Sequence, residues 1–261
     1  MPDLYLRLHD HDDDDGAEPA SPAAPLGEAA TLALLREADF TASKLIPWGS
    51  NYTFAVALET GDGREQLAIY KPEAGERPLC DFPDGTLYLR EHASYLLSER
   101  LGWGLVPPTV IRDGPHGVGS VQLYVEPKAE RGDDHVYWGQ RLCAIERLVL
   151  FDHIANNADR KLTHCLLDRD DHVWGIDHGL TFNAVPRLRT VLWQFTDAPI
   201  APELIADLCR LREEERELRD ELRDHLSRRE LDALIRRIGR LVTTGVHPRL
   251  DPHRNVPYGW W

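Results

Sequence analysis

Two aspartates in the second half of the sequence could carry out phosphoryl transfer. Asp159 lies in a polar stretch after a predicted helix, and Asp177 follows the second strand of a predicted hairpin. Because the hairpin returns the chain on itself, we expect both carboxylates near the same end of two paired strands. One could accept a proton from an attacking hydroxyl while the other holds Mg²⁺ against phosphate oxygens. Each aspartate alone is more simply explained as a turn residue, so it is the pair that favours chemistry.

A lysine and a glutamate in the first half could complete such a site. Lys71 ends a predicted strand just before Pro72. There its ammonium can project from a sheet and meet a phosphate as a point charge. Glu91 opens the next predicted helix and could hold Lys71 in place by pairing with it. The alternative for Glu91 is an acidic residue that only stabilises the start of that helix.

The elements that would position Lys71 and Glu91 form a compact α+β unit over residues 28–127. Strands are predicted where aromatic and β-branched residues cluster between turn residues, and helices where apolar residues recur at helical spacing. The predicted helices span 28–38 and 87–101, and the predicted strands span 40–46, 52–59, 66–71, 106–112 and 120–125.

Residues 128–261 are predicted to be mainly helical and to carry the two aspartates. A helix over 138–156 precedes two short strands, 165–167 and 172–176, which a turn of polar residues joins. The chain beyond them is predicted to be helical, with a mixed-charge helix over 211–226, up to an extended or turn-like tail over 247–261. Ser227 and Glu230 have the spacing of a capping box, which starts a further amphipathic helix.

Composition limits the class of protein. The 261 residues are 42% hydrophobic, which is ordinary for a soluble globular chain. No apolar run approaches the roughly 18–20 residues of a membrane span, and the acidic start is unlike a secretory signal. The four cysteines are far apart, which favours free thiols in a reducing compartment. We therefore expect a cytoplasmic protein without integral membrane association.

The charge is unevenly distributed. The formal net charge is −14, and residues 1–27, which hold seven acidic residues and one arginine, account for −6 of it. This acidic segment has little to bury and is predicted to be disordered. The remaining body is still acidic, which argues against nucleic acid as a partner and against a polybasic membrane anchor.

Five segments in chain order, between about residues 45 and 200, carry a likeness that none would establish alone. They are 68–72 (AIYKP), 90–97 (REHASYLL) continuing to 106–109 (VPPT), 119–126 (GSVQLYVE), 157–160 (NADR) and 175–179 (GIDHG). In combination they resemble the phosphatidylinositol 3-/4-kinase-like superfamily, most of all its type II phosphatidylinositol 4-kinase branch. The chain also looks like an uncharacterised actinobacterial branch of that superfamily.

The resemblance implies a two-lobed protein-kinase-like fold, with a small β-rich amino-terminal lobe (28–127) and a short helical carboxy-terminal lobe (128–261). It implies ATP and Mg²⁺, or Mn²⁺, as cofactors. The implied catalytic residues are Asp159 as base, Lys71 on the ATP phosphates and Arg160 in the same loop. The other implied roles fall to Glu91 orienting Lys71, the backbone around Val125 and Glu126 at adenine, Ser50 and Asn51 over the phosphates, and Asp177 as the main metal ligand.

Two departures from the family pattern matter. The loop over residues 47–52 holds one glycine, so cradling of phosphates by backbone N–H groups is less assured. His164 stands five residues after Asp159, where such kinases place an asparagine that holds a second metal. His164 is therefore a candidate metal ligand, although neutral imidazole prefers softer metals than Mg²⁺.

The sequence thus predicts an ATP- and Mg²⁺-dependent kinase acting on an unidentified hydroxyl of a small polyol, a lipid headgroup or a protein. The acidic surface favours a soluble or protein acceptor over a lipid. Two alternatives stay open. One is a nucleotide-binding pseudokinase that regulates a partner protein, and the other is a kinase-fold nucleotidyltransferase.

Overall fold

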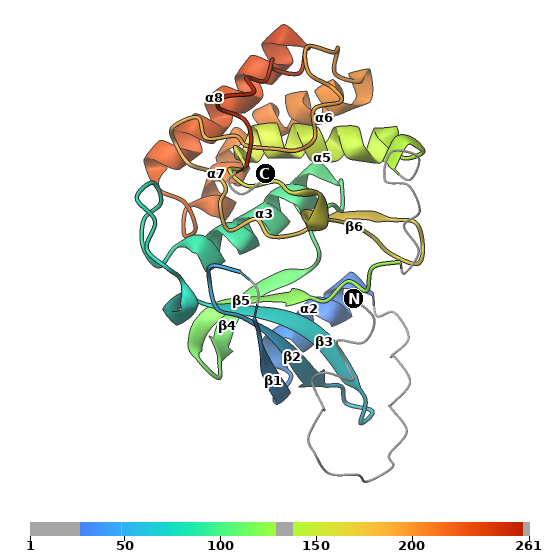
Figure 1. Ribbon diagram of the computed structural model, residues 1–261, viewed down its shortest axis with the longest axis vertical. Helices are drawn as coiled ribbons and strands as arrows, with labels where there is room; N and C mark the ends of the chain where they lie inside the picture. The colour runs from blue at the N-terminus through green and yellow to red at the C-terminus, as the bar shows by residue number, and fades with distance from the viewer. Residues whose placement is uncertain (1–26, 48, 129–137, 258–261) are drawn as a thin grey trace.

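The structure is a computed structural model that describes residues 27–47, 49–128 and 138–257. The predicted acidic tail, apart from Gly27, lies outside these residues. Within them, the first half of the chain forms a sheet together with two α-helices, and the second half is mainly helical (Figure 1). The predicted α+β, two-lobed architecture is confirmed.

Five antiparallel strands form the sheet in the order β1-β2-β3-β5-β4. Their bounds are β1 Phe40–Ile46, β2 Thr53–Glu59, β3 Glu65–Pro72, β4 Thr109–Gly114 and β5 Gly117–Leu123. Successive side chains of a strand point to opposite faces. Ala68 and Tyr70 of β3 are buried in the core under helix α2 (Glu28–Glu37), so Lys71 lies on the other face of the sheet.

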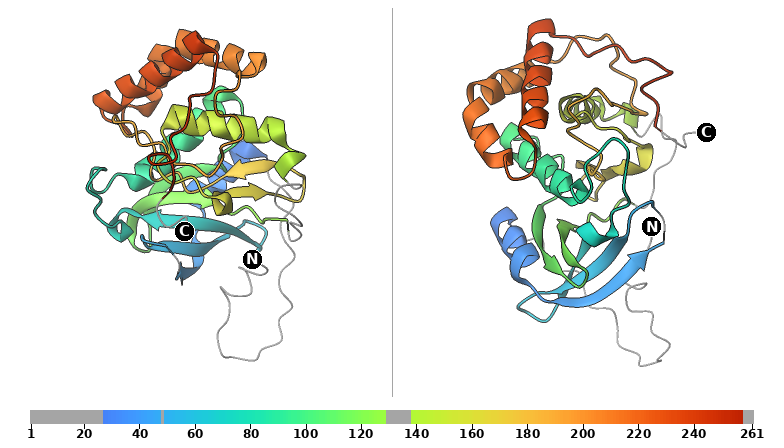
Figure 2. Two further views of the ribbon diagram at one scale, coloured as in Figure 1. Left: turned by 45° about the horizontal axis from the view of Figure 1, so that its top comes forward. Right: turned by 90° about the vertical axis from the view of Figure 1, so that its left-hand side faces the viewer.

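The helix between β3 and β4, α3 (Leu87–Leu101), lies between the sheet and the carboxy-terminal helices (Figure 2). Its Leu97 and Leu101 belong to the largest apolar core, together with Phe151 and Leu234 of later helices. Since α3 shares a core with the helical part, it cannot move with the sheet alone without exposing apolar surface.

The helical part holds a short hairpin among its helices. The elements in chain order are α5 Leu142–Ala155, η2 Leu162–His164, β6 Cys165–Leu167, β7 Val173–Gly175, α6 Pro202–Glu213, α7 Glu215–Leu222 and α8 Arg228–Thr244. The predicted capping box is present, because Ser227 and Glu230 bond to each other's backbone N–H groups at the start of α8. None of the helices in the described ranges is long and apolar enough to cross a membrane.

Several predicted boundaries were wrong. β4 begins at Thr109, three residues later than predicted, because Pro107 and Pro108 have no N–H to donate to the neighbouring strand. The predicted mixed-charge helix is broken at Glu214 into α6 and α7 and ends at Leu222. Residues 177–201 contain no helix, although the sequence analysis predicted this part of the chain to be helical. This irregular segment bonds instead to the loop after α5, for example from the Arg189 N–H to the Asn157 carbonyl at 2.9 Å.

Four histidines in and around the helices, two of them buried and two half-buried, predict that acid destabilises the fold. Burial lowers the pKa of each, to about 3 for His92 and His153 and in the same direction for His225 and His247. The unfolded chain therefore binds more protons below about pH 6.5, so stability falls as pH falls. Each such histidine removes up to about 1.4 kcal/mol per pH unit in that range.

Urea unfolding at pH 7.5, 6.5 and 5.5 checks this expectation. Replacing both His92 and His225 with Gln should make the decline in the free energy of unfolding shallower. An unfolding free energy that stays level between pH 7.5 and 5.5 would contradict it.

Candidate active site

A cavity of about 800 Å³ lies between the sheet and the helical part. Its walls come from the β1–β2 loop, β3, α3, the chain after β5, η2 and the chain after β7. Eight of the ten predicted site residues line it: Ser50, Asn51, Lys71, Glu91, Val125, Asp159, His164 and Asp177. Arg160 and Glu126 are not among the lining residues. The fold therefore brings together residues that are up to 127 positions apart in the chain.

Lys71 connects the sheet to α3 and to the chain after β7 at this cavity. Its Nζ donates to Glu91 Oε1 and, at 2.9 Å, to Asp177 Oδ1. Although burial opposes the charge, Asp177 and Glu91 together raise the pKa of Lys71 above its ordinary value. The predicted Lys71–Glu91 pair is thus present, and Lys71 is a cation at neutral pH.

Glu91 uses its second oxygen to hold the chain beside Asp177. Oε2 accepts the backbone N–H of His178 at 2.9 Å, and the Glu91 side chain is only 3% exposed. One carboxylate therefore ties Lys71 of the sheet to the turn that carries Asp177.

Asp177 has a backbone conformation that few residues with a side chain adopt, although aspartate tolerates it better than most. Its φ is +60°, in the left-handed region, which costs roughly 1–2 kcal/mol for a residue with a Cβ. The Lys71 ammonium lowers the pKa of Asp177 below its usual range, so the carboxylate is ionised. About half of this side chain is exposed, and it faces the cavity. Strain of this kind is commonly found at functional sites.

Asp159 lies in the loop after α5 and is held by its neighbours. Asn157 accepts the Asp159 N–H through Oδ1 at 3.0 Å, while its Nδ2 donates to Asp152 at 2.9 Å. The Asp159 carboxylate pairs with Lys161 at 2.8 Å and remains partly exposed. The sequence analysis did not identify Asp152 as a supporting residue. An acidic residue on the apolar side of a predicted helix is seldom buried without a partner, and this signal could have indicated its role.

Arg160 lies behind the cavity and has no exposed surface. Its Nε and Nη2 donate to both oxygens of Asp152 at 2.8 and 2.9 Å. Its Nη1 donates to the carbonyls of His164 and Ile176, both at 3.1 Å. These contacts link the loop of Asp159 to the strand end of Asp177. A guanidinium buried and engaged in this way is placed to hold the two acids in position, and it is not among the residues that line the cavity.

His164 lies beside Asp177, with Nε2 3.3 Å from Oδ2. Burial lowers its pKa, so the imidazole is neutral, and Nδ1 is buried without a hydrogen-bond partner among the described residues. Carboxylate and neutral imidazole together fit a divalent cation that takes its remaining ligands from phosphates and water. No cluster of three or more His, Cys, Asp or Glu side chains suited to a metal occurs in the described part of the chain. Asp177 and His164 are therefore two side chains that could contribute ligands to a metal at the cavity.

Of the residues expected near adenine and the phosphates, Ser50, Asn51 and Val125 line the cavity and Glu126 does not. Val125 lines it, but the Glu126 side chain turns outward to Arg169 at 2.7 Å, so a contact of its backbone with adenine stays a prediction. In the β1–β2 loop, Asn51 Oδ1 accepts the N–H of Arg77 at 2.9 Å, and Ser50 is exposed. Asn51 thus fixes the loop to the segment after β3.

The positioning role of Arg160 gives a stability prediction. Arg160→Met leaves the Asp152 carboxyl group buried without its charged partner, which typically costs about 3–5 kcal/mol. Lys161→Met removes the partly exposed pair with Asp159 and should cost about 1 kcal/mol or less. Urea unfolding of both variants at pH 7.5 compares them directly. Equal losses for the two variants would show that the buried pair is not the support inferred here.

Comparisons with known proteins agree with this architecture. No family model matches the chain. The solved structure of the golgi casein kinase has a TM-score of 0.52 at 13% identity, covering 83% of this chain and 74% of that one. The hydra Fam20 structure with sugar has a TM-score of 0.53 at 15% identity, covering 83% and 87%. These likenesses show a kinase-like fold.

A closer likeness is one of sequence. Protein Rv2133c of Mycobacterium tuberculosis (strain ATCC 25618 / H37Rv) is 34% identical over 261 residues, which cover 87% of this chain and 94% of that protein. Identity at this level over nearly the whole of both chains shows common descent. The chain belongs to the same family as the mycobacterial protein Rv2133c.

Proposed function

We propose that this protein is an ATP- and Mg²⁺-dependent phosphotransferase, of the phosphatidylinositol 3-/4-kinase-like type, that acts on a hydroxyl group. The observation that carries the proposal is the placement of Lys71. It lies between Glu91 and Asp177 at a cavity that Asp159 also lines. Phosphoryl transfer depends mainly on positioning and on neutralising phosphate charge, and this arrangement supplies both.

Each charged group has a distinct part in this proposal. Lys71 binds the phosphates of ATP, and Glu91 keeps its ammonium in place when Asp177 turns to other contacts. Asp159 accepts the proton of the acceptor hydroxyl, since it lines the cavity and its loop is fixed through Asn157. The backbone of the chain at Val125 and Glu126 faces the adenine.

Asp177 and His164 are the side chains that would hold the metal. A bound Mg²⁺ or Mn²⁺ would neutralise charge on the phosphate oxygens. Asp177 is ionised, and His164 presents a neutral nitrogen 3.3 Å from it. An imidazole at this position favours a softer cation, so we propose that Mn²⁺ is accepted as well as Mg²⁺.

The acceptor is a hydroxyl of a soluble polyol or of a protein in this proposal, and a lipid headgroup is less favoured. The net charge of −14 would repel an anionic membrane surface. The cytoplasmic location expected from the four free cysteines is part of the same proposal.

A second candidate function is a nucleotide-binding pseudokinase that regulates a partner. The observation that favours it is His164, which stands where an asparagine is expected, together with the loop of residues 47–52, whose Asn51 is engaged by Arg77. Such a protein would bind ATP without turning it over.

The division of labour between the two aspartates predicts different defects. Asp159→Asn should lower turnover by about 10²-fold or more, the usual scale for losing a general base, with little change in affinity for Mg·ATP. Asp177→Asn should weaken Mg·ATP binding as well as turnover. Thermal melting with Mg·ATP measures the affinities, since saturation at a hundredfold excess over Kd stabilises by about 2.7 kcal/mol.

Asp170→Asn is the matched control, because Asp170 is an exposed aspartate in the β6–β7 turn. The control should behave as the parent protein. Should both site variants leave a demonstrated activity intact, the role assignment is wrong. ATP binding without any turnover in the parent protein would favour the pseudokinase.

His164 gives a separate prediction about the metal. His164→Ala should weaken binding of Mn·ATP by about 10-fold or more, as loss of a metal contact or its support does, and binding of Mg·ATP by less. Isothermal titration with each metal gives the two ratios. Equal ratios for Mn²⁺ and Mg²⁺ would show that His164 is only a loop residue.

A further inference from the structure

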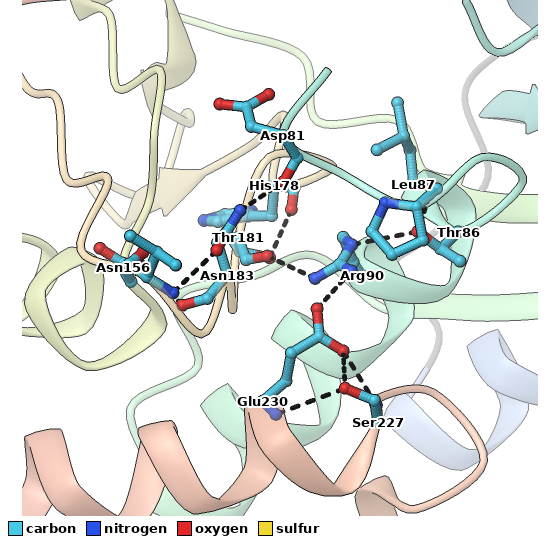
Figure 3. A network of polar contacts seen from close by, with 12 residues as sticks. Asp81, Thr86, Leu87, Arg90, Asn156, His178, Thr181, Asn183, Ser227 and Glu230 are labelled. Atoms are coloured by element: carbon cyan, nitrogen blue, oxygen red, sulfur yellow. Dashed lines mark hydrogen bonds and ion pairs between the residues drawn. The ribbon is translucent and has the colours of Figure 1, made fainter. Parts of the chain in front are cut away.

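The residue next to Glu91 on α3 is a buried arginine at the centre of a polar network (Figure 3). The Arg90 side chain is 1% exposed. Its Nη1 donates to the Thr181 carbonyl at 2.7 Å, and its Nη2 donates to Glu230 Oε1 at 2.5 Å. Its guanidinium also lies 5.0 Å above the centre of the Phe82 ring. The sequence alone did not single out Arg90 as a site residue, and the proposed chemistry does not use it.

The partners of Arg90 are themselves fixed. Glu230 is the third helical residue of α8, and its other oxygen accepts the N–H and hydroxyl of Ser227 at 2.9 and 2.7 Å. Although burial opposes ionisation, Arg90 and Ser227 lower the pKa of Glu230, so the carboxylate is charged. Thr181 donates through Oγ1 to the carbonyl of His178 at 2.7 Å. Arg90 thus joins α3 both to α8 and to the turn that follows Asp177.

The neighbouring position of Glu91 makes this connection relevant to the cavity. Consecutive residues on a helix point about 100° apart, because one turn takes 3.6 residues. With Arg90 held in the helical part, Glu91 points to Lys71 and to the His178 N–H. A rotation or outward shift of α3 would separate Arg90 from Glu230 and leave two buried charges unpaired, which is strongly unfavourable.

We propose that Arg90 is a positioning residue, which holds α3 at the one rotation where Glu91 meets Lys71 and so keeps the nucleotide site assembled. The proposal rests on the proposed nucleotide function for its effect on binding, whereas its effect on α3 does not depend on it. Arg90 acts through Glu91. Removing the Arg90 contacts should therefore matter for nucleotide binding only while Glu91 can still hold Lys71.

A double-mutant cycle tests this dependence. Arg90→Lys keeps a positive charge but cannot reach Thr181 and Glu230 together with the planar fork of arginine. It should weaken binding of Mg²⁺ with a non-hydrolysable ATP analogue by about fivefold or more, the lower end of typical coupling between sites. In a Glu91→Gln background the same change should alter affinity by less than about twofold, within the error of additivity. Isothermal titration calorimetry measures all four proteins.

Arg210→Lys is the matched control. Arg210 also donates two hydrogen bonds to α3, to the carbonyls of Arg100 and Leu101 at 3.0 Å, but at the far end of the helix from Glu91. The Arg210→Lys variant should bind the nucleotide with unchanged affinity. A loss from Arg90→Lys that is equally large in the Glu91→Gln background, or equally large for Arg210→Lys, would overturn the positioning role.

Hydrogen exchange in the protein without nucleotide separates this proposal from the proposed function. Arg90→Lys, and the milder Glu230→Gln, should raise exchange in the first turns of α3 over the rate in the parent protein. If the parent binds no nucleotide, the proposed function fails, and the exchange result still decides the role of Arg90. Unchanged exchange in both variants would overturn it.

Discussion

The ammonium of Lys71 lies between two carboxylates from different elements, Glu91 from α3 and Asp177 from the chain after β7. Without this cation, the acids would repel each other at short range. With it, the sheet, α3 and the helical part share one point of contact. In the proposed function, a metal on Asp177 would free part of the hydrogen-bonding capacity of Lys71 for phosphates. The geometry of the whole cavity depends on how firmly these three side chains are held.

Two buried arginines provide that support from different directions. Arg160 ties the loop of Asp159 to the strand end of Asp177 through Asp152 and two carbonyls. Arg90 ties α3 to α8 through Glu230. Each arginine satisfies several carbonyl or carboxylate oxygens at once, which its planar fork of donors allows and lysine does not. Both link separate segments of the chain, so interior ion pairs support the cavity in addition to the contacts among its own lining residues.

The sequence was sufficient for the elements that carry local signals. Alternation of buried and less buried side chains in β3 places Lys71 on the face of the sheet away from α2. The capping box of Ser227 and Glu230 fixes the start of α8. Contacts between distant segments carry no such signal. The place of Arg160 behind the cavity depends on Asp152 being buried beside it, which only the folded chain shows. The irregular course of residues 177–201 has the same cause, since its hydrogen bonds are made with the loop after α5 and not within a helix.

The most direct test of the account is where the label of ATP goes. Purified protein is incubated with Mg²⁺ and ATP labelled in either the γ- or the α-phosphate, together with inositol compounds, other polyols and a protein extract. The account predicts that γ-label appears on an acceptor, that α-label does not, and that Lys71→Met abolishes the transfer. Transfer of the α-label would instead identify a nucleotidyltransferase. Label that stays on ATP with every acceptor, while ATP binds, would contradict phosphoryl transfer as the function of this site.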